Sequence, residues 1–141
     1  MTQAFQKKYL IFTSFFIGSF GPIFFLGSMF ETSALASWSL DLLSWPIDGN
    51  MNYSAPTTRF LSALTGGFLF GWGMTVFCLS RWVFDLAPNE CRKVVIVGIL
   101  SWFCLDSLGS VLSGNSYNLI FNILVACLAI GPLVRKAKEL D

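Results

Sequence analysis

Apolar residues gather in four long runs along the chain, and polar segments separate these runs. A membrane-spanning α-helix takes about 20 residues, because the hydrocarbon core is about 30 Å thick and a helix rises about 1.5 Å per residue. None of the runs shows the alternation of an outer-membrane strand. The pattern predicts an all-α fold, a four-transmembrane-helix bundle in which residues 1–141 form a single integral membrane domain, with helices at about 9–29, 57–80, 94–113 and 117–134.

The segment between the first two runs has a helical pattern of its own over about 33–45. Leu35, Trp38, Leu42 and Trp45 recur at spacings of three and four residues, whereas the polar residues fall elsewhere on the helical wheel. This spacing is typical of an amphipathic helix, and tryptophan suits the headgroup level of a membrane. We therefore expect a short interfacial helix on the outer membrane surface, in the first outer loop. A lid over a pocket is the alternative interpretation.

Small residues mark the faces on which helices approach each other closely. Four glycines crowd the second run, and Gly67 and Gly71 have the GxxxG spacing that lets two helix backbones come together. In the first run, Ser14 and Gly18 have a similar spacing, and Pro22 is expected to kink the helix. We expect packing within the bundle, rather than a dimer face, at Gly66, Gly67, Gly71, Gly73, Gly18 and Pro22.

Composition and charge favour a membrane protein with a defined orientation. Apolar residues make up 55% of the chain and charged residues only 12%, against about a quarter charged in an ordinary soluble domain. Arg59 is the only basic residue on the outer side of the predicted topology. Because lysine and arginine concentrate on the cytoplasmic side, we expect both termini to be cytoplasmic. The basic residues assigned to that side are Lys7, Lys8, Arg81, Arg92, Lys93, Arg135, Lys136 and Lys138.

One acidic residue, Asp106, stands inside the third apolar run. A carboxylate that faces lipid costs about 3 kcal/mol at the centre of a helix, so Asp106 should point inward and find a partner. Arg59 is the only base on that side of the membrane, and Asn122 is predicted to lie at a similar depth. The expected polar cluster comprises Asp106, Arg59, Asn122, Ser110, Asn118 and Trp102.

Two interpretations of this cluster stay open. In the first, Arg59 and Asp106 form a closed ion pair that fixes helix register and binds nothing. In the second, the cluster lines a pocket that opens to the outside and takes a small polar molecule, a lipid headgroup or a proton. Below Asp106 the sequence offers only Ser101, Thr75 and Ser80 toward the inner face, which favours binding or scaffolding over transport.

Residues that the chain lacks exclude several classes of function. It has no histidine, which removes the usual haem ligand and most histidine-based catalysis. No nucleotide-binding motif occurs, and no basic patch suits nucleic acid beyond the residues that set topology. We expect a protein that is not an enzyme and has no cofactor or metal. The expected partners are membrane lipids, and another membrane protein or a second copy of the chain.

The stretch "RFLSALTGGFLFGWG", which follows "WPIDG", resembles small four-span bacterial inner-membrane proteins of unassigned function that are loosely DoxX-like. The likeness covers about a quarter of the chain. It implies a multi-pass four-helix bundle in the inner membrane and carries over no catalytic residue. We expect a small accessory or scaffold protein, or a bundle that binds a lipid-like or small ligand in an outer polar pocket. The alternative is a small proton- or cation-coupled transporter that uses Asp106.

Overall fold

The computed structural model describes residues 1–137, and all regular elements within them are helical. The α-helices of the described chain are α1 (Gln3–Leu26), α2 (Ala34–Ser44), α3 (Pro56–Cys78), α4 (Pro88–Leu112) and α5 (Asn118–Ile130). Shorter segments accompany them, namely the 3-10 turns η1 (Phe30–Thr32) and η3 (Gly131–Leu133) and the π-helical η2 (Leu79–Val83). The predicted all-α fold class is confirmed.

Three of these elements are long and apolar enough to cross a membrane: α1, α3 together with η2, and α4. α5 is shorter, with 13 residues. It ends because Gly131 and Pro132 turn the chain into η3, and proline cannot continue an α-helix. A helix of this length covers about 20 Å, which is less than the hydrocarbon core of a bilayer. A fourth span therefore stays a prediction.

Two of the long helices begin earlier than their apolar runs. α1 begins at Gln3, because the Thr2 hydroxyl accepts an N-cap hydrogen bond from Phe5 N–H (3.3 Å). α4 begins at Pro88, since proline suits the first position of a helix. Lysine and arginine in the first turns extend their charged heads away from the apolar stem. Hydropathy alone therefore places both helix starts too late.

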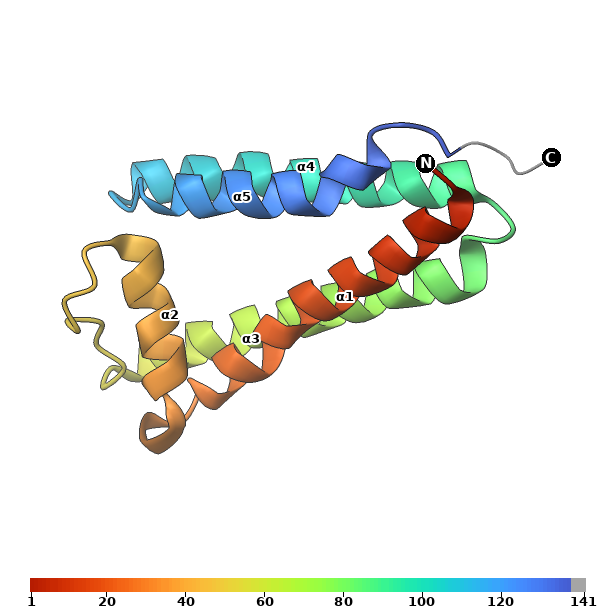
Figure 1. Cartoon of the computed structure of the whole chain (residues 1–141). Helices are drawn as coiled ribbons and strands as arrows, with labels where there is room; N and C mark the ends of the chain where they lie inside the picture. The colour runs from red at the N-terminus through yellow and green to blue at the C-terminus, as the bar shows by residue number, and fades with distance from the viewer. Residues whose placement is uncertain (138–141) are drawn as a thin grey trace.

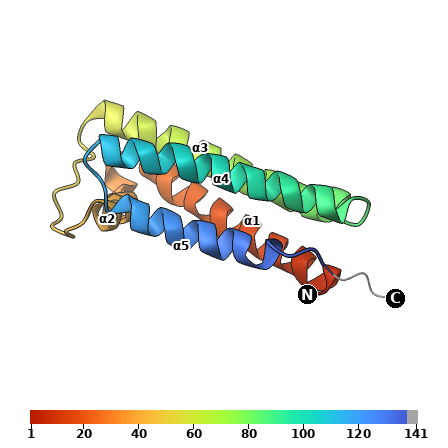
Figure 2. The same ribbon diagram turned by 90° about the horizontal axis from the view of Figure 1, so that it is seen from above.

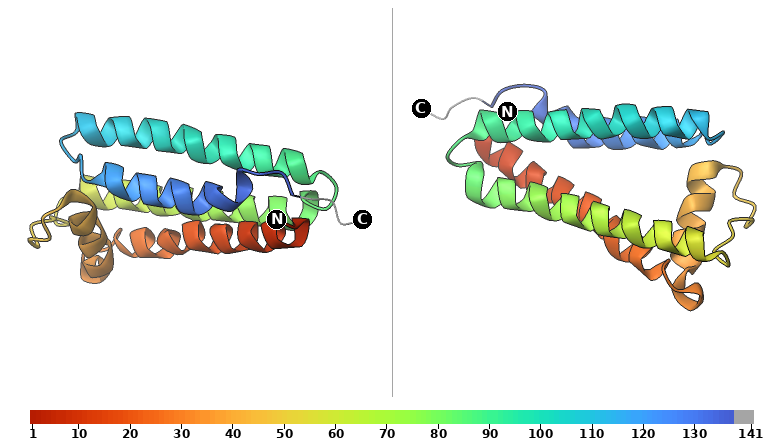
Figure 3. Two further views of the ribbon diagram at one scale, coloured as in Figure 1. Left: turned by 45° about the horizontal axis from the view of Figure 1, so that its top comes forward. Right: turned by 180° about the vertical axis from the view of Figure 1, so that it is seen from behind.

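The long helices form two antiparallel pairs, α1 with α3 and α4 with α5 (Figure 1). The pairs meet at one end, the basic end, and separate toward the other, the α2 end, where α2 runs between them (Figures 1 and 3). Both ends of the described chain and the α3–α4 turn lie at the basic end (Figure 2). That end carries Lys7, Lys8, Arg81, Arg92, Lys93, Arg135 and Lys136. Lys138 lies outside the described residues.

Backbone contact holds α1 against α3. A Cβ atom added to Gly73 would lie 2.6 Å from Gly18 Cα and 2.7 Å from Ser14 O. A Cβ atom added to Gly66 would lie 2.7 Å from Gly21 O. All of these neighbours are backbone atoms, so a side chain at either position forces the helices apart. Glycine is what allows this close approach.

The GxxxG pair lies on a different side of α3. Gly67 and Gly71 face open space, because an added Cβ atom would meet nothing within 4 Å. Gly66 and Gly73 are two helical turns apart and share the face toward α1, whereas their neighbours project away from it. Pro22 is exposed on α1 and borders an apolar groove between α1 and α3. Gly67 and Gly71 therefore take no part in the packing of α1 on α3.

Side chains close the bundle at the basic end. Gln6 Nε2 donates to the carbonyl oxygens of Pro132 (3.0 Å) and Arg135 (2.7 Å). Arg92 Nη1 donates to the carbonyl oxygen of Leu133 (2.7 Å). An apolar core extends from these contacts toward the middle of the bundle. Its buried members are Leu10, Ile17, Val76, Phe84, Cys91, Val95, Ile99, Ala126, Ala129 and Leu133.

α2 turns an apolar face outward at the other end. Leu35, Trp38 and Trp45 are exposed, Leu42 is half-buried, and Ala36 faces the bundle. The amphipathic helix expected at about 33–45 is present as α2. It runs across the direction of the long helices (Figure 3), which is the orientation that a helix in the membrane plane requires. Its contact with the membrane stays a prediction.

Two buried polar residues fix the loop that follows α2. Asp41 Oδ2 accepts a hydrogen bond from Gly49 N–H (2.8 Å). The hydroxyl of Tyr53, a residue only 3% exposed, lies 3.3 Å from Ser62 Oγ, which in turn donates to Phe24 O (2.8 Å). Burial raises the pKa of the Tyr53 phenol above its ordinary value. These contacts tie the loop to α1 and α3.

Candidate functional site

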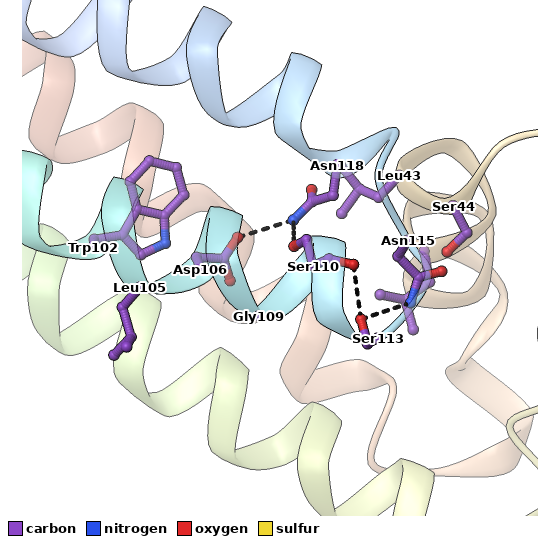
Figure 4. A pocket seen from close by; sticks show the side chains of 11 residues that line it. Leu43, Ser44, Trp102, Leu105, Asp106, Gly109, Ser110, Ser113, Asn115 and Asn118 are labelled. Carbon is purple, nitrogen blue, oxygen red and sulfur yellow. Dashed lines mark hydrogen bonds between the residues drawn. The ribbon is translucent and has the colours of Figure 1, made fainter.

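A cavity of about 500 Å³ lies at the α2 end, between α2, α4 and the start of α5 (Figure 4). Apolar carbon, neutral polar groups and a single carboxylate form its walls. The cavity is bordered by an outward face of α4, because Leu105 lines it and is also 77% exposed. The lining residues are Leu40, Leu43, Ser44, Trp102, Leu105, Asp106, Gly109, Ser110, Ser113, Asn115 and Asn118.

Asp106 is the centre of a polar network between α4 and α5. Its Oδ2 accepts hydrogen bonds from Nδ2 of Asn118 (2.9 Å; Figure 4) and Nδ2 of Asn122 (2.7 Å). The same amides also donate to serines of α4, Asn118 to Ser110 Oγ (2.8 Å) and Asn122 to Ser107 Oγ (3.1 Å). The two asparagines stand one turn apart on α5, so both reach the same face of α4.

Only one oxygen of the Asp106 carboxylate takes part in this network. Within residues 1–137, no hydrogen bond reaches Oδ1. Asp106 is partly exposed and lines the cavity, so Oδ1 is the oxygen left for water or a ligand. An ionised carboxylate has about four lone-pair sites. The site therefore keeps acceptor capacity that the protein itself does not use.

Arg59 is not a member of this network, contrary to the expected cluster. Its Nη1 donates to the carbonyl oxygens of Tyr53 (3.1 Å) and Ser54 (2.7 Å). Neither ion pair in the described part of the chain includes Asp106, so the expected pairing is absent. The reason is geometric: α3 diverges from α4 at this end (Figure 1), and loop carbonyls next to the start of α3 take up the guanidinium instead.

The other predicted residues meet the cavity in different ways. Asn118, Ser110 and Trp102 line it, whereas Asn122 is only 3% exposed and lies behind Asp106. Trp102 also contacts Trp72 of α3, with ring centroids 5.9 Å apart. This aromatic contact bridges the two helix pairs beside the cavity.

The sequence pattern does not single out Ser107 or the wall formed by α2. Ser107 is buried and accepts from Asn122, but it directly follows Asp106, so the three- and four-residue spacing of a helical face does not include it. Its signal in the sequence is a polar residue next to Asp106 within an apolar run. Leu40 and Leu43 of α2 are three residues apart and line the cavity from the opposite side.

The α2 end is acidic. Asn50 N–H donates to Asp48 Oδ1 (3.0 Å), and this backbone hydrogen bond lowers the pKa of the exposed Asp48 carboxyl. No basic residue lines the cavity in the described chain, and no three His, Cys, Asp or Glu residues among those described lie close enough to hold a metal ion. The acids of this end are Glu31, Asp41, Asp48 and Asp106, with Arg59 as the accompanying base.

The chain matches no protein-family model, no curated protein and no solved structure. The DoxX-like likeness of residues 59–73 therefore stays a prediction. The described residues define a class: a helical protein with three helices of membrane-spanning length and a cavity that holds one carboxylate. Because one fold can carry many functions, the function of this protein depends on the chemistry of that site.

Proposed function

We propose that the protein is a non-enzymatic, multi-pass inner-membrane protein that binds a small or lipid-like ligand in the cavity at the α2 end. The observation that carries this proposal is the Asp106 carboxylate, which is only half satisfied and stands on the wall of a cavity of about 500 Å³. Ligand pockets have volumes of about 300–1,000 Å³. An ionisable residue within a span-length helix is costly, and such residues commonly mark functional sites.

The distribution of charge supports an orientation with both termini in the cytoplasm. Lysines and arginines gather at the basic end, where the described chain begins and ends (Figure 2), as the positive-inside rule requires. In this orientation the cavity opens toward the outer third of the membrane. α2 then lies at the outer surface, and α5 with its flanking turns completes a fourth pass.

The interior beneath the cavity supports binding rather than transport. A coupled transporter using Asp106 needs polar groups that continue from the acid to the opposite membrane face. In the described chain, most of the interior toward the basic end is the apolar core. Thr13, Ser14 and Ser80 are also buried there, but the hydroxyls of Ser14 and Ser80 donate to carbonyls three residues earlier in the chain, Ile11 O and Phe77 O. Gln6 and Arg92 hold that end together through backbone carbonyls. A largely apolar interior beneath the cavity fits a binding or accessory role, with membrane lipids as partners.

A cavity-filling substitution tests the proposal. Gly109 lines the cavity, and an added Cβ atom there would meet nothing within 4 Å, so Gly109→Leu fills the space without a backbone clash. Gly98→Leu is the matched control, because Gly98 lies on the same helix, has the same open surroundings and does not line the cavity. The full chain is released from maltoside micelles and weighed with its bound molecules by native mass spectrometry.

We expect a bound species on the wild type and on Gly98→Leu, and at least about a tenfold lower occupancy on Gly109→Leu. The leucine side chain fills the cavity, so both lost contacts and overpacking lower the affinity for the ligand. Equal occupancy in all three proteins contradicts the proposal, since the bound molecules would then lie outside this cavity. Circular dichroism of each variant shows that the helices are retained.

A further inference from the structure

We infer that the cavity takes an amphiphile with an ammonium head, whose amine binds Asp106 Oδ1 and whose apolar part lies against α2 and α4. This inference rests on the proposed ligand-binding function and names the chemical class of the ligand. The same chemistry occurs in two sources, an aminophospholipid of the membrane and a free amphiphilic amine.

Charge is the first argument for an ammonium head. Asp106 supplies the only ionisable side chain of the cavity lining, and no basic residue lines the cavity in the described chain. Arg59, the base of this end, donates to the carbonyls of Tyr53 and Ser54 instead. A negatively charged ligand would meet an uncompensated carboxylate, whereas a cation supplies the missing countercharge.

Hydrogen-bond capacity is the second argument. Asn118 and Asn122 donate to Oδ2 and leave Oδ1 without a protein donor in the described residues. An ammonium group brings donors and no acceptor, and its hydrogen bond to a carboxylate is of the stronger, charge-assisted kind. Trp102 lines the same wall one turn before Asp106, and an indole face attracts cations.

The apolar part of the ligand follows from the position of the cavity. Leu40 and Leu43 of α2 form one wall, and Leu105 of α4 forms another. Leu105 is 77% exposed, and the outward face of α4 continues from it toward the middle of the helix through Val97 and Val94, which are 61% and 55% exposed. An alkyl chain can therefore pass from the cavity onto the outward face of α4, where acyl chains lie in the proposed orientation.

Three probes with one chain and different heads test the ammonium head. Dodecylamine, dodecanol and dodecanoate are titrated into the full chain in maltoside micelles, and binding is measured by calorimetry. We expect dodecylamine to bind at least about tenfold more tightly than dodecanol, as one charge-assisted hydrogen bond allows, and dodecanoate to bind most weakly.

The Asp106→Asn variant tests whether the carboxylate causes the preference for dodecylamine over dodecanol. Asparagine keeps an acceptor for Asn118 and Asn122 while it removes the charge, so we expect the preference for dodecylamine to disappear. Glu31→Gln is the matched control, because it removes an exposed acid of the same end and should leave the preference unchanged. A preference that survives in Asp106→Asn, or that is absent from the wild type, overturns the ammonium class.

The Gly109→Leu variant distinguishes a wrong ammonium class from a wrong binding function of the cavity. If Gly109→Leu weakens amine and alcohol equally and the wild type does not distinguish them, the cavity binds amphiphiles but the ammonium head is wrong. If Gly109→Leu changes the binding of none of the probes, the cavity is not the binding site and both proposals fail.

A competition experiment distinguishes the two sources of the amine. Lyso-phosphatidylethanolamine and lyso-phosphatidylglycerol are each added to the dodecylamine complex. Displacement by the ethanolamine lipid alone assigns an aminophospholipid, and displacement by neither assigns a free amphiphilic amine. Displacement by the glycerol lipid, which carries no amine, overturns the inference.

Discussion

In the α1/α3 pair, backbone lies against backbone at Gly18 and Gly73, whereas in the α4/α5 pair amide side chains reach across to a carboxylate. The first contact is made by backbone atoms and is close enough that a single methyl group does not fit. The second is made by side-chain hydrogen bonds and leaves one carboxylate oxygen without a donor among the described residues. Asp106 therefore lines the cavity at the α2 end, whereas Gly73 packs against the backbone of α1.

This difference assigns different roles to the two pairs. Small residues bring membrane helices together through dispersion and close approach, and the contacts at Gly66 and Gly73 leave no room for a side chain. Polar side chains hold helices together through a few directed hydrogen bonds, and a carboxylate has more acceptor sites than Asn118 and Asn122 use. We interpret α1/α3 as the rigid half of the molecule and α4/α5 as the half that carries the site.

The largest expected effect is at the glycine contact. Gly73→Ala places a Cβ atom 2.6 Å from Gly18 Cα and 2.7 Å from both Gly18 N and Ser14 O. The helices must separate, and we expect a loss of about 3 kcal/mol in the free energy of unfolding. The measurement is unfolding of the full chain by sodium dodecyl sulfate in mixed micelles, followed by circular dichroism.

Gly71→Ala is the control for this prediction. Gly71 lies on the same helix, and an added Cβ atom meets nothing within 4 Å, so the free energy of unfolding should change by less than about 1 kcal/mol. If the two substitutions have the same effect, the close contact between α1 and α3 does not exist in the folded protein.

A smaller effect is expected in the polar pair. Asn122→Ala removes the hydrogen bonds to Asp106 Oδ2 (2.7 Å) and Ser107 Oγ (3.1 Å) at a position only 3% exposed. We expect a loss of about 1 to 2 kcal/mol, since hydrogen bonds between membrane helices contribute about 1 kcal/mol each. The same detergent titration measures it.

Asn115→Ala is the matched substitution outside the network. Asn115 is exposed, and its hydrogen bond to Ser113 Oγ is long (3.3 Å), so its loss should change the free energy of unfolding by less than about 0.5 kcal/mol. An Asn122→Ala protein as stable as Asn115→Ala would show that the amide–carboxylate network does not hold α5 on α4.

The sequence predicts the parts of this comparison that depend on one helix at a time. Apolar runs predict the long helices, and the three- and four-residue spacing of Leu35, Trp38 and Leu42 predicts α2. Asp106 and Asn122 could be grouped because each lies at a similar depth counted from the α4–α5 turn. These inferences need only the rise and periodicity of a helix.

The predictions that the structure does not confirm concern the glycine contacts of α3 and the partner of Arg59, which depend on the rotation of a helix and the path of a loop. Which glycines of α3 meet α1 depends on the rotation of the helix. The sequence therefore predicts packing at Gly66, Gly67, Gly71 and Gly73 alike, whereas only Gly66 and Gly73 meet α1. The partner of Arg59 depends on the loop before α3, which brings the Tyr53 carbonyl to the guanidinium. Hydropathy contains no information on either.

The smallest expected effect concerns the loop that ties α2 to the α1/α3 pair. Tyr53→Phe removes the contact between the phenol and Ser62 Oγ (3.3 Å), while Ser62 still donates to Phe24 O (2.8 Å). We expect a loss of only about 0.5 kcal/mol at neutral pH, measured by the same unfolding titration.

The contribution of Tyr53 to the free energy of unfolding depends on pH in the alkaline range, because burial raises the pKa of its phenol above 10.0 in the folded protein. Between the ordinary pKa and the raised one, the folded state holds a proton that the unfolded state has lost. The ionisation of Tyr53 therefore has no effect on stability below about pH 10, and stability falls as the pH rises through this interval. Tyr53→Phe has no such proton, so its free energy of unfolding should fall less steeply than that of the wild type. Parallel slopes for the two proteins would show that the loop leaves Tyr53 open to water and is not anchored to the rigid pair.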